Sequence, residues 1–140
     1  MKDNQIKIPE LLLRIIAPAV FIFIGTCIIF PFAKGMPVFF IPKAEKVARV
    51  EICNILTDEI IITDDAETIE LAVNLKNFIT YKVGSSFEAN ETGTMHITYF
   101  LIDGTEISFS ADETTFYRNG KGYVLKESGI FIKIADTVFF

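Results

Sequence analysis

Residues 15–33 are the feature that most constrains this chain, because nineteen consecutive residues carry no charge and consist mainly of Ile, Phe, Ala and Val. As an α-helix they span roughly 28 Å, close to the hydrocarbon thickness of a bilayer. A soluble helix of this length shows a polar face, and this segment has none. Arg14 and Lys34 flank it, and their long side chains can reach the headgroups. The sequence therefore predicts a transmembrane helix, with the membrane lipid bilayer as a partner through residues 15–33.

Two processing patterns compete with a retained anchor. The segment ends "FPFAKGMPVFF", which lacks the small-residue pattern of a secretory cleavage site. The stretch "IGTC" is a weak lipoprotein match, because Thr26 precedes Cys27 and the apolar run continues beyond it. Cleavage and lipidation stay open as alternatives, and the pattern favours a retained anchor. We expect Pro18 in the first turn of the helix and Pro31 near its end, where a missing N–H is tolerated.

The orientation of the span follows less directly from charge. Three basic side chains and the terminal amine precede it, and four basic side chains follow it before residue 50, so the positive-inside rule gives nearly a draw. A short leading tail before one span is typical of a signal anchor with the tail inside. The predicted organisation is a cytoplasmic tail and transmembrane anchor (1–34), a connector (35–46) and a small extracytoplasmic domain (47–140), held at the cell membrane.

The charge balance changes sharply behind the span. Residues 1–34 carry four basic and two acidic side chains, for a net +2, whereas the rest carry nine basic and sixteen acidic ones, for a net −7. A domain of about 100 residues can bury a core without metals or disulfides. The acidic balance excludes nucleic acid as a partner, because phosphate binding needs clustered Lys and Arg. Cys27 lies in the span and Cys53 in the domain, so two separate thiols are expected.

Several short strands are predicted behind the connector, whose residues 38–41 lie either at the membrane interface or against the domain. The stretches "VARVEICNIL" (47–56) and "DEIIITD" (58–64) are β-branched and partly alternating, which predicts two strands paired through a turn at 57–59.

Two hairpins follow, and apolar alternation sets the register of the first. In "TMHITYFLIDGTEISFSAD" (94–112), a three-residue loop at 102–104 places Gly104 in the left-handed conformation and gives one apolar face. In "TTFYRNGKGYVL", Asn119-Gly120 is a strong two-residue turn signal. The predicted cross-strand pairs are Tyr99 with Ile107, Ile97 with Phe109, Met95 with Ala111, and Phe116 with Tyr123.

One long amphipathic helix is predicted in "DAETIELAVNLKNFITYK", started by Asp64 and Glu67 as a capping pair. A polar loop is predicted at 83–93. Residues 128–140 are ambiguous, because their apolar residues fit both a strand and a helix; we favour a helix capped by Ser128. The apolar arc of the long helix comprises Ile69, Ala72, Val73, Leu75, Phe78 and Ile79.

The predicted fold class is therefore α+β: an N-terminal transmembrane helix, then an antiparallel sheet of about six strands packed by one long helix and, if residues 128–140 are helical, a C-terminal helix.

No motif in the sequence predicts catalysis, and no catalytic, cofactor-binding or metal-binding residue is assigned. His96 is expected on the face of its strand opposite Ile97 and Tyr99, either solvated or loosely covered. It is the sole histidine and no cysteines stand at metal-binding spacing, so a metal site is implausible. Acidic pairs at 58–59, 64–65 and 112–113 are typical of turns and helix caps. Phe109, Phe116, Tyr117 and Tyr123 are expected in the core, with an exposed binding face as the alternative.

One resemblance to known proteins rests on four stretches of the sequence: "IPKAEKVARVEI", "DDAETIELAVNL", "ITYFLIDGTEISFS" and "NGKGYVLKE". Over residues 41 to about 135 the chain resembles a group of small uncharacterised extracytoplasmic domains of Gram-positive bacteria, often tethered as lipoproteins or by one helix. The resemblance implies a bacterial, membrane-tethered domain. It implies no activity and no functional residues.

The sequence favours a single-pass membrane-anchored extracytoplasmic domain that binds a protein or peptide partner and is not an enzyme. Its contact surface is expected on the sheet face or the 83–93 loop. An alternative is an accessory or regulatory subunit of a membrane transporter or sensor, whose span packs through Gly25 and Thr26. An envelope hydrolase that pairs His96 with a nearby carboxylate is the least favoured reading.

Overall fold

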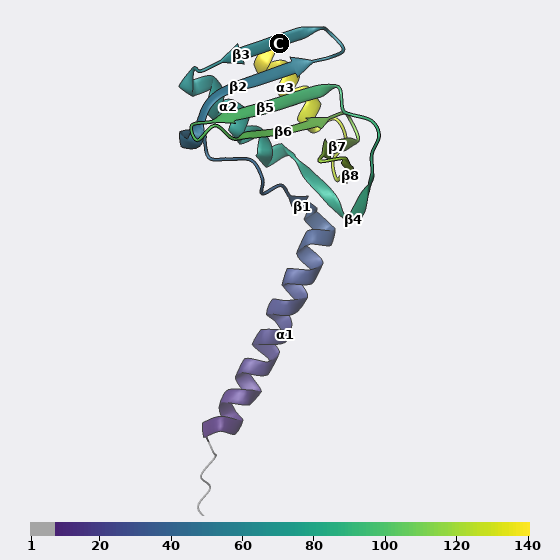
Figure 1. The fold of residues 1–140 in the computed structure, drawn as a ribbon. Helices are drawn as coiled ribbons and strands as arrows, with labels where there is room; N and C mark the ends of the chain where they lie inside the picture. The colour runs from purple at the N-terminus through teal and green to yellow at the C-terminus, as the bar shows by residue number, and fades with distance from the viewer. Residues whose placement is uncertain (1–7) are drawn as a thin grey trace, which may run out of the picture.

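The computed structural model describes residues 8–140, and the first seven residues of the predicted tail lie outside this range. Figure 1 shows a long helix leading into an α+β domain. The helices are α1 (Ile8–Lys34), α2 (Ala66–Asn74) and α3 (Ile130–Phe139), with 3₁₀ turns η1 (Ala44–Lys46) and η2 (Leu75–Phe78). The strands are β1 (Met36–Pro37), β2 (Val47–Asn54), β3 (Glu59–Thr63), β4 (Thr80–Glu88), β5 (Met95–Leu101), β6 (Glu106–Ala111), β7 (Thr115–Arg118) and β8 (Lys121–Leu125).

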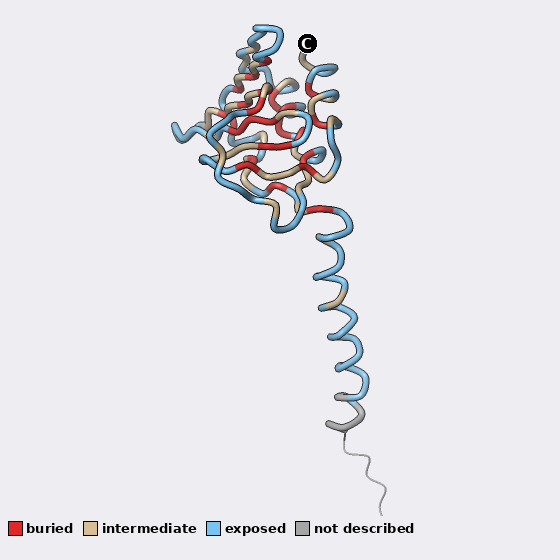
Figure 2. The backbone as a smooth tube through the Cα atoms, turned by 90° about the vertical axis from the view of Figure 1, so that its right-hand side faces the viewer, coloured by how far each residue is buried: buried red, intermediate tan, exposed pale blue. Residues whose placement is uncertain are grey.

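Helix α1 contains the predicted apolar span. Its segment Arg14–Lys34 has 21 residues and is long and apolar enough to cross a membrane, a test that an N-terminal signal sequence also passes. Its described side chains are almost all exposed, whereas the buried residues gather in the domain (Figure 2). The helix begins at Ile8, so the predicted first-turn position of Pro18 is wrong and this proline lies in the helix interior. Pro31 lies in the last turn, as predicted.

The sheet has eight antiparallel strands in the order β1-β4-β8-β7-β6-β5-β2-β3. The predicted number of about six is too low because β1 and β4 were not recognised. Strand β1 has only two residues, too few to show any periodicity. The predicted polar loop at 83–93 is wrong for residues 83–88, which belong to β4. Between Tyr81 and Ser86 its register against β8 shifts, and Gly84 has a φ of 70°, so a bulge interrupts the alternation that identifies a strand.

The helix predicted after residue 64 is present, but its N-cap and its C-terminal end lie at other residues than predicted. Asp65, not Asp64, caps α2, and its Oδ2 accepts a hydrogen bond of 2.8 Å from the Thr68 N–H. The long helix predicted there ends at Asn74 and continues as η2. In a 3₁₀ turn the period drops to three residues, and the predicted core residue Phe78 is therefore 43% exposed.

The C-terminal segment is a helix, as favoured, but Ser128 does not cap it. Gly129 occupies the N-cap position with a φ of 74° and makes no side-chain cap. Phe131 and Ala135, one helical turn apart, are fully buried. The segment therefore follows the helical period of its apolar residues.

The register of both hairpins is confirmed. Tyr99 pairs with Ile107 and Phe116 with Tyr123. Gly104 has a φ of 86°, and Asn119 and Gly120 both have positive φ values. These are the left-handed conformations that short hairpin turns demand. The other predicted pairs, Ile97 with Phe109 and Met95 with Ala111, are also present.

The core lies between the sheet and one helical layer, since α2 and α3 cover the same face of the sheet (Figure 1). Tyr99 is fully buried at its centre, and its hydroxyl donates a 2.8 Å hydrogen bond to the Ala72 carbonyl. Burial raises the pKa of the Tyr99 hydroxyl. This bond fastens α2 to β5, an interior strand of the sheet.

The predicted connector (35–46) takes part in the sheet and the core. Its residues 36 and 37 form β1, and Val38 and Ile41 are buried against the domain. Phe39, between them, is 81% exposed. Of the two positions considered for residues 38–41, packing against the domain holds for Val38 and Ile41.

Substituting Tyr99→Phe should lower the free energy of unfolding by about 1 kcal/mol, because the buried Ala72 carbonyl loses its donor. Urea denaturation of the detergent-solubilised full chain, followed by circular dichroism, measures this loss. Tyr123→Phe is the control, since this half-buried hydroxyl makes no hydrogen bond within residues 8–140. Equal losses in the two variants would show that the bond to Ala72 contributes nothing specific.

Candidate functional site

The candidate site lies on the face of the sheet turned away from α2 and α3, which no helix of the described chain covers (Figure 1). Strand alternation brings to this face the residues between the core positions. The pairing registers align one row of side chains across five neighbouring strands. From the edge inward, this row is Ile60, Cys53, His96, Ser110 and Tyr117.

The row starts at β3, the last strand of the sheet. Strand β3 pairs with β2 on one side only, so its other side is a free edge. Ile60 and Ile62 point to the open face, and each is 57% exposed. A free edge with exposed β-branched side chains is a template for pairing with another extended chain.

Farther along the open face, a cavity of about 260 Å³ lies between the loop after β4 and strands β5, β6 and β7. Two hydrogen bonds hold this loop: the Ala89 N–H donates to the Gly120 carbonyl at 2.9 Å, and the Gly93 N–H donates to Ser110 Oγ at 2.9 Å. Gly93 lies so close to the Ala111 backbone that a Cβ there would overlap it. The loop is therefore fixed over the sheet as one wall of the cavity.

His96 lines this cavity and is half-buried, on the predicted face of its strand and covered by the loop after β4. Its Nε2 is shielded from solvent and has no hydrogen-bond partner within the described residues. Ser110, its cross-strand neighbour, uses its hydroxyl to accept from Gly93. Within residues 8–140 no carboxylate or serine is hydrogen-bonded to His96.

Asp112 organises the polar side of the cavity. Partial burial opposes ionisation of its carboxylate, but hydrogen bonds outweigh burial and lower its pKa. Its Oδ1 accepts from the Thr114 and Thr115 N–H groups, each at 2.8 Å, and its Oδ2 accepts from the Tyr117 hydroxyl at 2.8 Å. Burial and the neighbouring Asp112 carboxylate raise the pKa of Tyr117. Asp112 thus closes the turn between β6 and β7 and orients Tyr117, which lines the cavity.

The other acidic pairs serve local structure. Asp58 has a φ of 58° in the turn before β3, and Asp65 caps α2, where hydrogen bonds from Thr68 lower its pKa. In the described part of the chain, no group of three or more His, Cys, Asp or Glu side chains is placed to hold a metal ion. Both cysteines are free thiols, Cys27 exposed and Cys53 half-buried.

The four aromatic residues that the sequence singled out divide between core and cavity. Phe109 and Phe116 are buried, and Tyr123 stacks on Phe116 with ring centroids 4.7 Å apart. Tyr117 faces the cavity on the opposite side of the sheet. Of these four side chains, Tyr117 is therefore the one that projects to the open face.

Comparison of the chain with protein-family models, with curated proteins and with solved structures found no match, so the site is interpreted from its own geometry.

Substituting Asp112→Asn should lower the free energy of unfolding by about 1 kcal/mol at neutral pH, because the charged acceptor of three hydrogen bonds is lost. The folded pKa of Asp112 lies below its unfolded value of about 3.9, so this stability is present above that pH and is lost as pH falls through the folded pKa. Denaturation at several pH values should show the wild type and the variant converging in acid. Glu113→Gln, at the exposed neighbouring residue, should change neither the free energy of unfolding nor its dependence on pH. If the free energies of unfolding of wild type and Asp112→Asn still differ in acid, the ionised Asp112 carboxylate is not the cause of the difference.

Proposed function

We propose that this protein is a single-pass membrane protein that displays a small α+β domain outside the cytoplasm and binds an extended protein segment there. The length and exposed apolar surface of α1 support the anchor. The resemblance to tethered Gram-positive domains supports a bacterial cell surface as the setting. The free edge of β3 is the observation that carries the binding role.

Natural sheets usually protect an edge strand with charges, prolines or a bulge along the strand itself. Strand β3 has none of these among its central residues, which read Ile60-Ile61-Ile62. Its free edge therefore suits the addition of a partner strand, in which main-chain hydrogen bonds give affinity and alternate side chains give specificity. Ile60 and Ile62 would contact the apolar side chains of such a strand.

Charge around β3 indicates what kind of partner strand fits. Residues 50–75 contain no Lys or Arg. Asp58-Glu59 and Asp64-Asp65 stand at the two ends of the strand, and a second copy paired antiparallel would bring these pairs together in mutual repulsion. The partner is thus a different chain, apolar in its centre and basic at its ends. The acidic residues of this stretch are Glu51, Asp58, Glu59, Asp64, Asp65, Glu67 and Glu70.

A direct test uses a synthetic peptide of alternating Val and Thr with two Lys at each end, and a control peptide with Glu in place of each Lys. The detergent-solubilised full chain should bind the Lys peptide at least about tenfold more tightly than the Glu peptide, a difference of about 1.4 kcal/mol. Fluorescence anisotropy measures the affinities, and amide hydrogen exchange should show protection along β3 on binding.

Two variants make that test specific. Ile62→Lys should remove most of the binding, whereas Ile102→Lys should retain it, because Ile102 is equally apolar and 71% exposed but lies in the β5–β6 turn. Equal binding of the two peptides, unchanged exchange of the β3 amides, or a concentration-dependent dimer of the chain alone would each overturn the assignment.

The proposed topology predicts that a tag placed after Phe140 is digested when intact cells are treated with protease, and that the tagged chain stays in the membrane fraction. A protected tag would place the domain in the cytoplasm. A soluble product that begins downstream of residue 34 would show instead that α1 is a removable signal.

The second candidate is an accessory subunit whose span packs against a larger membrane protein. A groove on the surface of α1 favours it, since Gly25 leaves open space beside Thr26 and Ile29. In that case the identity of the span matters, whereas strand addition at β3 requires only that some apolar helix anchor the domain.

A further inference from the structure

We propose that the base of the domain rests on anionic lipid headgroups, with Phe39 inserted at the interface. The base comprises Phe39 and the basic side chains of Lys76, Lys82, Arg118, Lys121 and Lys126. The inference rests on the proposed anchoring through α1 and adds a second contact between the protein and the bilayer.

The first argument is the shortness of the junction between α1 and the sheet. Gly35 is the only residue between the end of α1 at Lys34 and the start of β1 at Met36. It is buried with a φ of 85°, and a Cβ there would lie 3.0–3.1 Å from the Lys126 Cβ, the Thr80 Cβ and the Tyr81 carbonyl oxygen. Where α1 leaves the bilayer, the sheet therefore begins at once.

A side chain of the sheet also binds the helix end directly. The Lys126 ammonium donates a 3.0 Å hydrogen bond to the Phe32 carbonyl, one of the last carbonyls of α1. A cation at this position is favoured because the C-terminal end of a helix carries partial negative charge. The junction is a packed, hydrogen-bonded contact, so the orientation of the domain follows that of the helix.

The second argument is the exposure of Phe39. It lies five residues after Lys34, so it is at most about 18 Å from the helix end along the chain. Its side chain is 81% exposed, although Val38 before it and Ile41 after it are buried. Phe39 lines two cavities of about 390 Å³ each, one lined also by Lys76 and the other also by Arg118. An exposed aromatic ring with basic side chains nearby is typical of membrane-surface contacts.

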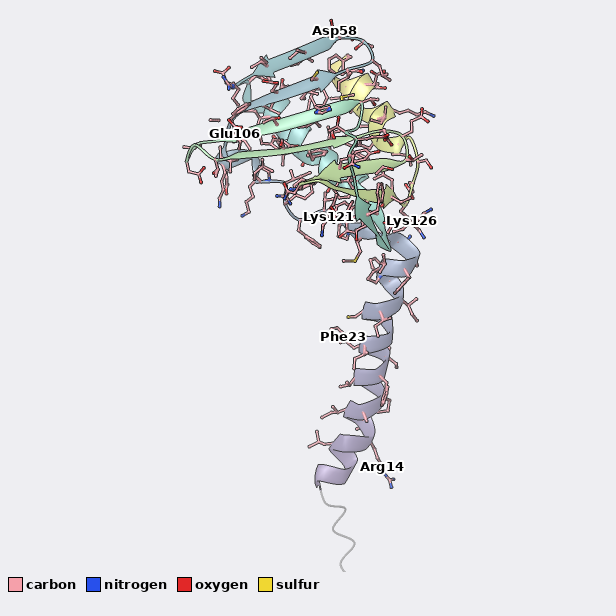
Figure 3. The ribbon with its side chains drawn as sticks, turned by 45° about the vertical axis from the view of Figure 1, so that its right-hand side comes forward. Arg14, Phe23, Asp58, Glu106, Lys121 and Lys126 are labelled. Carbon is pink, nitrogen blue, oxygen red and sulfur yellow. The ribbon has the colours of Figure 1, made fainter. Side chains whose placement is uncertain are left out.

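The third argument is the distribution of charge. In Figure 3, Lys121 and Lys126 lie at the lower end of the domain beside α1, whereas Asp58 lies at the opposite end. Lys82 follows Tyr81, which pairs with Met36 of β1, so it too belongs to the lower end. Glu88, Glu91 and Glu127 adjoin the base, Glu91 in the cavity that Arg118 and Lys121 also line, and five cations against three carboxylates leave the base positive. The acidic end of the domain points away from the proposed lipid surface and the basic end toward it.

The full chain has no tryptophan, so the variant Phe39→Trp carries a single fluorescent reporter. The probe is the full-length variant reconstituted in phosphatidylglycerol-containing vesicles, in which lipids brominated near the headgroup should quench its emission. Phosphatidylcholine vesicles, or about 0.5 M salt, should remove most of the quenching by weakening electrostatic attraction. The double variant Lys82→Glu and Lys121→Glu should have the same effect, since both side chains are exposed.

The matched control is Leu56→Trp, because Leu56 is 76% exposed in the same turn as Asp58, at the far end of the domain. Its emission should not be quenched in any vesicle. If the chain floats with the vesicles but Trp emission at position 39 is unquenched or independent of lipid charge, the base does not contact anionic lipid. In that case the proposed anchoring through α1 still holds. If the chain does not float with vesicles at all, the anchor itself is wrong.

Discussion

The buried Gly35 junction is the constraint on which the arrangement of this protein depends. A positive φ at a residue without a Cβ lets the chain turn from the axis of α1 into β1 within one residue. The Lys126 ammonium, directly after the end of β8, then ties the sheet to the last turn of α1. Because this contact replaces a flexible linker, whatever holds α1 also orients the sheet.

From that junction, the sheet divides the domain into two unlike surfaces. One face is covered by α2 and α3, and the hydrogen bond from Tyr99 to Ala72 joins β5 to α2. The other face keeps a polar cavity beside His96 and ends at β3, where apolar side chains meet the free strand edge. A sheet covered on one side and anchored at one end therefore presents its open face and its β3 edge to solvent.

Local patterns in the sequence were reliable where one physical rule dominates. The Asn119-Gly120 turn and the 102–104 loop set the register of their hairpins, because left-handed residues and apolar alternation agree there. They failed at β4, whose Gly84 bulge interrupts the alternation, and at η2, where the helical period changes before Phe78 is reached. At β4 the pairing with β8 overrode the local pattern, and at η2 the backbone changed from an α-helix to a 3₁₀ turn. The sequence left open whether His96 is solvated or covered, and it did not identify the loop after β4 as the cover, because the two segments meet only in the folded sheet.

The sequence by itself determined the apolar helix, the α+β class and the separation of a basic leader from an acidic domain, because length, periodicity and charge are properties of contiguous residues. It also determined that His96 has no metal-binding companions at motif spacing. Only the tertiary structure decided that β3 is an edge, that a cavity lies over His96, and that Phe39 stays outside the core while its neighbours enter it. Those outcomes depend on which strands become neighbours, and strand order results from packing between distant segments.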